Sequence, residues 1–230
     1  MELKESALPM DSKAKAVSIH EVLLEEYGHH PWRRHRDPLS TLIFTVLSQN
    51  TTSINQERAG RGLQERFSSW EEVRDAEVGE IVEAIRSAGL ANIRASRIKE
   101  ILQTITVRCG KLDLSFLEEM EGDEAKEWLT SLRGVGPKTA ACVLLFSFGK
   151  PVLPVDTHVL RVSKRLGLIP AKMAASKAQT LLEEIVPAEA IYDFHLNMIR
   201  HGRNICRAQR PRCERCVVRH LCDYLQRSDR

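Results

Sequence analysis

The sequence predicts an all-α protein built in two parts. Apolar residues recur at helical spacing along nearly all of its 230 residues, and the period-two alternation of β-strands is otherwise absent. The one strand-like run, residues 151–155, contains two prolines, so we expect an extended linker there. This linker is the best candidate for the boundary between the two parts, and the helix expected near the N-terminus could pack with either.

The expected helices follow one another with short connections. The first begins after Asp11 and Ser12, and its apolar face comprises Val17, Val22, Leu23 and Tyr27. Asp37 is a good N-cap and Pro38 suits the first helical position, so the next helix is expected over residues 39–48. Further helices are expected over residues 53–66, 70–75, 79–88, 94–109, 123–132, 138–147, 157–166, 172–186 and 189–202.

Composition is ordinary for a globular protein and indicates no membrane or export segment. Charged residues make up 28% of the chain, and no apolar run approaches the roughly 18 residues of a spanning helix. Glu2, Lys4, Glu5 and Asp11 break up the N-terminus, which therefore resembles neither a secretory nor a transit peptide. We expect a monomer in the cytoplasm, associated with the nucleoid and not with a membrane.

Four cysteines near the C-terminus have the spacing of a metal centre. They are Cys206, Cys213, Cys216 and Cys222, in the pattern C-x6-C-x2-C-x5-C. Zinc sites usually contain two C-x2-4-C pairs or histidines, whereas only one such pair is present here, so an iron–sulfur cluster is favoured and zinc stays open. The two other cysteines, Cys109 and Cys142, lie in apolar helical stretches and are expected to be buried.

Positive charge is concentrated in the same segment. Residues 201–230 contain eight arginines and three acidic residues, while the whole chain has a net charge of only +3. Arg207, Arg210 and Arg212 fall within the first loop between cysteines. A basic loop of this kind is typical of phosphate contact, and the alternative is an ordinary solvated surface loop.

A glycine-rich turn connects two expected helices at Gly134, Val135 and Gly136, followed by Pro137. Two glycines around one apolar residue permit a tight turn with positive φ and leave the backbone N–H groups uncovered. These groups and the positive end of the next helix can bind a phosphate oxygen. The alternative is a simple helix–helix corner with a glycine cap.

Lys138 and Asp156 are the candidates for chemistry. Lys138 falls in the first turn of a helix, where the helix dipole disfavours a cation and therefore favours the neutral amine that a Schiff-base nucleophile needs. The alternative is a lysine that points outward to a phosphate or to water. Asp156 is expected to cap the helix 157–166, and the same carboxylate can stabilise a sugar cation. His158 is expected to bond locally.

Three segments together resemble the endonuclease III family of helix-hairpin-helix DNA glycosylases. They are L-R-G-V-G-P-K-T-A at 132–140, P-V-D-T-H at 154–158 and H-G-R-N-I-C at 201–206 with the cysteines that follow. The resemblance covers about residues 30–225. It implies a six-helix barrel domain over residues 32–150, a discontinuous cluster domain over 1–31 and 151–230, and a [4Fe-4S] cluster on the four cysteines.

The resemblance also assigns roles to individual residues. Lys138 falls at the family's Schiff-base lysine and Asp156 at its catalytic aspartate, while Gly134–Gly136 fall on the hairpin that grips the DNA backbone. The family places a glutamine in the gap left by the extruded nucleotide; here Asn50 holds that position with Gln49 beside it, so which of them inserts stays open. Leu90 resembles the second wedge residue. The alternatives are a polar pair at a helix end and a core leucine.

The resemblance implies a bifunctional enzyme that binds double-stranded DNA containing a damaged base or an abasic site. It would remove oxidised thymine or cytosine and cut the strand by β-elimination through Lys138. One rival is a related monofunctional glycosylase that removes thymine or adenine from mismatches; Lys138 and the lack of a further C-terminal recognition domain disfavour the adenine type. The other rival is a non-catalytic DNA-binding protein that keeps hairpin and cluster.

Overall fold

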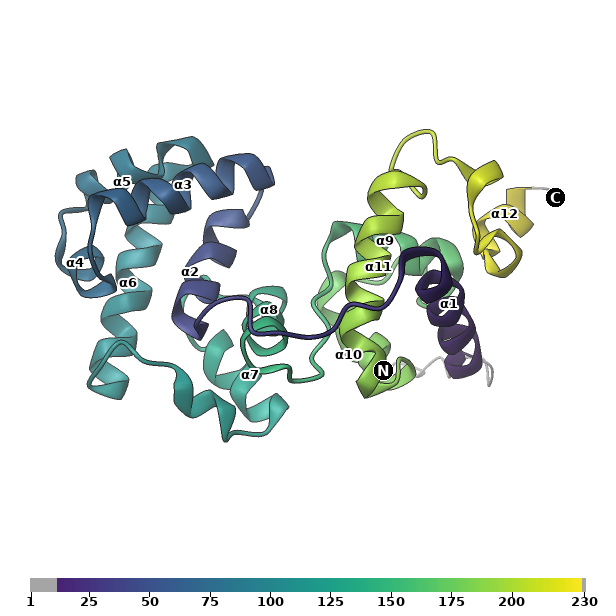
Figure 1. The fold of residues 1–230 in the computed structure, drawn as a ribbon, viewed down its shortest axis with the longest axis horizontal. Helices are drawn as coiled ribbons and strands as arrows, with labels where there is room; N and C mark the ends of the chain where they lie inside the picture. Colours follow the sequence, from purple (N-terminus) through teal and green to yellow (C-terminus); the bar gives the residue numbers. More distant parts are fainter. Residues whose placement is uncertain (1–11, 229–230) are drawn as a thin grey trace, which may run out of the picture. The chain divides into compact units, whose positions relative to one another are not determined.

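The structure, a computed structural model, describes residues 12–228 as helices joined by turns and by longer irregular segments (Figure 1). No strand occurs in this range, so the all-α prediction is confirmed. The expectations for Glu2, Lys4, Glu5 and Asp11 concern residues outside it. None of the helices between residues 12 and 228 is both long and apolar enough to cross a membrane.

The chain forms two compact units. One comprises Arg33–Lys150, and the other comprises, within the described part of the chain, residues 12–32 and 151–228. The helices of the first unit are α2 (Pro38–Ser48), α3 (Ser53–Arg66), α4 (Trp70–Asp75), α5 (Val78–Ile85), α6 (Ala91–Cys109), α7 (Gly122–Thr130) and α8 (Pro137–Phe148), with short 3₁₀ turns at Arg86–Ala88 and Ser115–Glu118.

Helix α2 forms the centre of the Arg33–Lys150 unit. It begins as predicted, because the Asp37 side chain accepts a hydrogen bond from the Ser40 amide at 2.9 Å and Pro38 occupies the first turn. Its side chains are buried on all sides, as expected for a helix surrounded by others. It packs along α8, where Ser147 donates a hydrogen bond to Thr41 at 2.9 Å.

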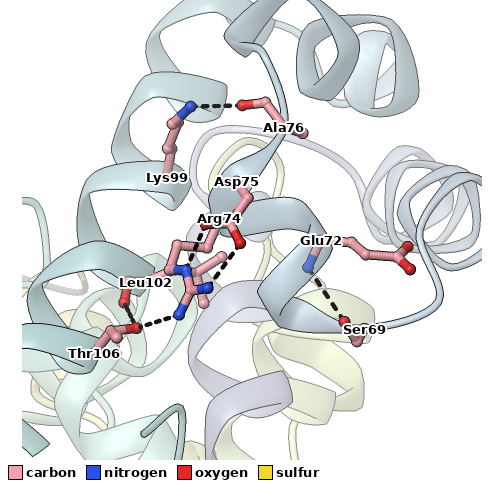
Figure 2. A network of polar contacts seen from close by, with 8 residues as sticks. All are labelled: Ser69, Glu72, Arg74, Asp75, Ala76, Lys99, Leu102 and Thr106. Atoms are coloured by element: carbon pink, nitrogen blue, oxygen red, sulfur yellow. Dashed lines mark hydrogen bonds and ion pairs between the residues drawn. The ribbon is translucent and has the colours of Figure 1, made fainter. Parts of the chain in front are cut away.

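Helix α4 is attached to the middle and the C-terminal end of α6 (Figure 2). The Arg74 guanidinium donates to Thr106 Oγ1 at 3.2 Å and to both carboxylate oxygens of Asp75 at 2.7 Å. Lys99 Nζ donates to the Ala76 carbonyl at 2.6 Å. These contacts hold α4 against the middle and C-terminal half of α6.

The second unit contains α1 (Ser12–Tyr27), α9 (Thr157–Leu166), α10 (Ala175–Ile185), α11 (Ile191–Asn204) and α12 (Asp223–Ser228). Helix α11 packs against α1 and α9 (Figure 1). The buried face of α1 is Ala16, Ile19 and Leu23. The predicted face was therefore only partly right, because Val17, Val22 and Tyr27 lie at its edge and are half-buried.

Residues 151–155 form neither helix nor strand, but they are part of a packed core and not a free linker. Leu153 is fully buried, and its amide donates to Glu183 Oε1 at 2.8 Å. The carbonyl of Pro154 lies 2.9 Å from Nδ1 of the buried His195. The segment that leads to Asp156 is therefore fixed within its unit.

Candidate active site and metal centre

The glycine turn joins α7 to α8 and is anchored by its central residue. The Val135 side chain is buried, and its amide donates to the Leu132 carbonyl at 3.0 Å. Gly134 has a φ of 83°, which favours glycine. Gly136, the N-cap of α8, has a φ of −93° and a ψ of 173°. The expectation of positive φ therefore holds for Gly134 and is wrong for Gly136.

The two glycines differ in what surrounds them. A Cβ atom on Gly134 would overlap the side chain of Arg97, whereas a Cβ atom on Gly136 would meet nothing within 4 Å. The fold itself therefore explains glycine at 134 but does not require it at 136. The missing side chain at 136 leaves the amides at the start of α8 uncovered, and these amides lack partners within the helix.

Lys138 is the second residue of α8 and follows the hairpin directly. Its side chain is half-buried, and it makes no hydrogen bond or ion pair with any residue between 12 and 228. Its amine is thus available to an incoming ligand beside the uncovered amides.

Asp156 caps α9 in the other unit, as predicted. Its Oδ1 accepts hydrogen bonds from the amides of His158 and Val159, both at 2.8 Å. These bonds fix the carboxylate in one orientation at the end of the buried 151–155 segment. His158 bonds locally, as expected, with Nδ1 at 3.1 Å from the Arg161 guanidinium.

Gln49 and Asn50 differ in environment. Gln49 ends α2, and its side-chain amide reaches the Gly134 carbonyl and Thr139 Oγ1, both at 3.5 Å. Asn50 is exposed and has a φ of 50°. Gln49 therefore faces the hairpin, while Asn50 projects from the molecule.

Leu90 is also an exposed residue with a φ of 50°. It is 60% exposed, so its interpretation as a core leucine is wrong. It precedes the first turn of α6 directly, and the left-handed backbone at Gly89 and Leu90 lets α6 begin at Ala91, earlier than predicted.

All four cysteines of the C-terminal segment line one small cavity, together with Arg165 and His201. Burial raises the pKa of Cys216 to about 11, and the other thiols contribute to the shift. Burial also raises the pKa of Cys213, so a metal centre that supplies positive charge would favour the thiolates of these two residues.

The cavity fits a cluster better than a single ion. Four thiolates on one zinc ion would each lie about 2.3 Å from it. No three Cys, His, Asp or Glu side chains in the described part of the chain are close enough together to hold one ion. A four-iron cluster places each thiolate on a different iron, so it does not need three of these sulfurs within reach of one ion.

The His201 side chain reaches one of the sulfurs of this cavity and is in turn contacted by Tyr27. His201 Nε2 lies 3.4 Å from Cys216 Sγ, and its Nδ1 lies 3.0 Å from the Tyr27 hydroxyl. Burial lowers the pKa of His201 to about 4 and raises the pKa of Tyr27 to about 12, so the ring is neutral and the hydroxyl can donate to Nδ1. The remaining ring N–H then points at the Cys216 sulfur.

Arg165 of α9 braces the loop between the first two cysteines. It reaches Cys206 Sγ at 3.4 Å and donates to the carbonyls of Arg207 at 2.6 Å and Ala208 at 3.0 Å. The loop backbone is thereby fixed, while the side chains of Arg207 and Arg210 are exposed and that of Arg212 is half-exposed. This arrangement presents positive charge to an external partner.

Sequence reasoning missed three residues that contact these sites. They are Arg165, His201 and Arg94, whose guanidinium donates to the carbonyls of Gln49, Ala88 and Gly89. Arg165 carried a usable signal, because it follows Arg161 by four residues and therefore shares one helix face with it. His201 stands in the H-G-R-N-I-C segment but was not given a role. Nothing in the local sequence distinguishes the buried Arg94 from an exposed helix arginine.

Fold, hairpin and cysteine cavity together define a helix-hairpin-helix DNA repair protein, and the comparisons agree. Residues 43–188 match the HhH-GPD superfamily of base excision DNA repair proteins, and residues 206–222 match the iron-sulfur binding domain of endonuclease III. A relative from Arabidopsis thaliana is 39% identical over 73% of this chain, which spans only 57% of that relative.

Endonuclease III of Thermotoga maritima is 34% identical over 85% of this chain and 88% of its own length. A solved endonuclease III–DNA complex superposes with a TM-score of 0.80 at 30% identity, covering 97% of this chain and all of that one. The chain therefore belongs to the endonuclease III family of base-excision-repair DNA glycosylases and carries its [4Fe-4S] cluster. The four cysteines are the residues in segment 206–222 suited to hold it.

Proposed function

We propose that the protein is a bifunctional enzyme that removes oxidised pyrimidines from double-stranded DNA and then cleaves the strand at the abasic site. The observation that carries this proposal is the position of Lys138, in the first turn of α8 and directly after the uncovered hairpin amides. An amine at this point lies beside the phosphate that the hairpin would bind.

Similarity to a protein solved in complex with DNA supports DNA as the partner. In this proposal Gly134–Gly136 hold one phosphate through backbone N–H groups, and Arg207, Arg210 and Arg212 hold another. Affinity gained from phosphates alone depends on salt and ignores sequence. The protein acts as a monomer on chromosomal DNA, with a barrel domain over residues 32–150 and a cluster domain formed by 1–31 and 151–230.

The proposed reaction begins with a flipped nucleotide, whose extrusion is easiest for a damaged base. The neutral Lys138 amine attacks the sugar C1′, and the base leaves with the electrons of the glycosidic bond. The Asp156 carboxylate stabilises the positive charge that develops on the sugar. The amine then loses a proton and the sugar ring opens, which gives a Schiff base at C1′. Loss of a C2′ proton expels the 3′-phosphate, and water finally releases Lys138.

Borohydride trapping tests the proposal directly, because it reduces the Schiff base to a stable amine. We expect the wild-type protein to form a covalent adduct with duplexes that contain an abasic site or an oxidised pyrimidine. Lys138→Gln should abolish the adduct and leave DNA affinity largely unchanged. Lys111→Gln, a change at an exposed lysine paired with Asp113, is the matched control and should trap normally.

The outcomes separate the proposal from its rivals. Base release without an adduct would indicate a monofunctional glycosylase, and DNA binding without either would indicate a non-catalytic protein. A panel of duplexes, each with a different single lesion or mismatch, then identifies the base that the pocket accepts. Efficient release of thymine from mismatches, with no release of oxidised pyrimidines, would contradict the proposed substrate class.

A further inference from the structure

Arg94, on the first turns of α6, is a buried arginine that joins two separate turns of the chain. Its side chain is within the Arg33–Lys150 unit, and the residue is only 4% exposed. The guanidinium donates through Nη2 to the carbonyl of Gln49 and through Nη1 to the carbonyls of Ala88 and Gly89.

The environment of Arg94 is unusual for a buried cation. Its partners among residues 12–228 are main-chain carbonyls and include no carboxylate. Burial lowers the pKa of Arg94 from its ordinary value. The carbonyls compensate, since they stand at the C-terminal ends of α2 and of the 3₁₀ turn Arg86–Ala88, where helices leave acceptors unpaired and carry negative partial charge.

Two of the three carbonyls belong to residues that directly precede an exposed residue with a left-handed backbone conformation. Gln49 precedes Asn50 and Gly89 precedes Leu90, and both followers have a φ of 50°. A left-handed backbone is unfavourable for residues other than glycine unless their surroundings enforce it. Arg94 therefore fixes the peptide groups that set the direction of Asn50 and Leu90.

The surface around these two residues suits stacked bases. Ile54, on the first turn of α3, is 61% exposed, and Ile93, on the first turn of α6, is 57% exposed. The Ser87 hydroxyl donates to the Asn55 carbonyl at 3.3 Å and further ties the two turns together. Exposed apolar side chains on neighbouring turns are unfavourable in water but can contact base faces.

We propose that Arg94 is a positioning residue that holds Asn50 and Leu90 as one preformed unit for insertion into the base stack. Asn50 fills the gap left by the extruded nucleotide, and Leu90 enters beside it. The inference rests on the proposed function for its ligand, a duplex with an extruded or missing base. It also assigns the gap to Asn50, because Gln49 contributes its carbonyl to Arg94 and its side chain to the hairpin.

Preorganisation explains why a buried cation is useful at this place. Inserting two side chains from independent turns requires both turns to be ordered when DNA binds. A single guanidinium that holds both turns in advance removes this requirement. The effects of losing Asn50 and Leu90 should then be interdependent.

The test uses the full-length protein and a duplex with a tetrahydrofuran abasic analogue, which needs no catalysis. The preference for this duplex over the undamaged duplex is measured by competition binding. Arg94→Met, which keeps most of the side-chain volume but no donors, should reduce the preference about tenfold, a magnitude typical of coupled contacts, with affinity for undamaged DNA unchanged. Arg74→Met is the matched control, since Arg74 also links α6 to another element, near its opposite end (Figure 2). It should leave the preference unchanged.

A double-mutant cycle keeps the inference testable even if Arg94→Met does not fold. In the wild-type background, Asn50→Ala and Leu90→Ala should be coupled by about fivefold or more in this preference. Additive effects would overturn the inference, as would equal preferences in Arg94→Met and Arg74→Met. A wild type that prefers the analogue but forms no borohydride adduct would contradict the lyase proposal alone.

Discussion

Alanine substitutions at the two hairpin glycines should have opposite consequences for stability and for DNA binding. Gly134 has a φ of 83°, and a Cβ atom there would meet the Arg97 side chain. An L-residue in this backbone region costs about 1–2 kcal/mol, so Gly134→Ala should lower Tm by about 2–8 °C in a chain of this length. At Gly136 the backbone is already accessible to alanine and the space is empty. Alanine at 136 stabilises the protein by reducing the conformational freedom of the unfolded chain, and it destabilises the protein because it is a poorer N-cap than glycine. These two effects roughly cancel, so Gly136→Ala should change stability by less than about 0.5 kcal/mol.

DNA affinity, unlike stability, should depend mainly on the glycine at position 136. A methyl group at 136 would stand over the amides proposed to bind a phosphate, and a hydrogen bond to a charged group is worth about 1.5–3 kcal/mol. Gly136→Ala should therefore weaken DNA binding by about 10- to 100-fold, measured by fluorescence anisotropy at fixed salt. Thermal denaturation followed by circular dichroism measures stability in parallel. Wild-type affinity in a fully folded Gly136→Ala protein would refute the assignment of these amides to phosphate.

Three further predictions concern the other candidate residues. Asp156→Asn and Asp156→Ala both remove the carboxylate, so both should reduce single-turnover base excision by about 10²–10³-fold. Only Asp156→Ala also removes the helix cap and should lose about 0.5–2 kcal/mol of unfolding free energy. An active Asp156→Asn protein would limit Asp156 to its capping role. Arg207→Gln and Arg210→Gln should each reduce the slope of log affinity against log salt by about 1, and an unchanged slope would exclude phosphate contact. Cys213→Ser should lower the iron content and accelerate amide exchange in residues 206–222 but not in the Arg33–Lys150 unit; normal iron content would show that Cys213 is not a ligand.

Most helices were predictable because local signals coincide with packing. Asp37 and Pro38 mark the start of α2, and the apolar character of α2 and α8 on all sides matches their central position. The predicted buried face of α1 differs from the observed one. Val17 and Tyr27 are apolar enough to suggest burial, but they are only half-buried and lie at the edge of the contact with α11. The short elements around the cysteines, including α12, lack helical periodicity and depend on tertiary contacts.

The site was predictable where one short motif sets both conformation and chemistry. The hairpin, the lysine and the cysteines are of this kind. Gly136 shows the limit of such reasoning, since its glycine is not explained by backbone conformation. Arg94 shows a second limit. Its partners lie 45 residues away at Gln49 and five and six residues away at Gly89 and Ala88, so its role depends on the fold and not on a local pattern.

The most direct measurement of the proposed chemistry is peptide mapping, by mass spectrometry, of the adduct that borohydride forms with an abasic duplex. We predict that the remnant of the deoxyribose is attached to the side chain of Lys138. Attachment to another amine, or efficient strand cleavage without any adduct, would contradict the role of Lys138.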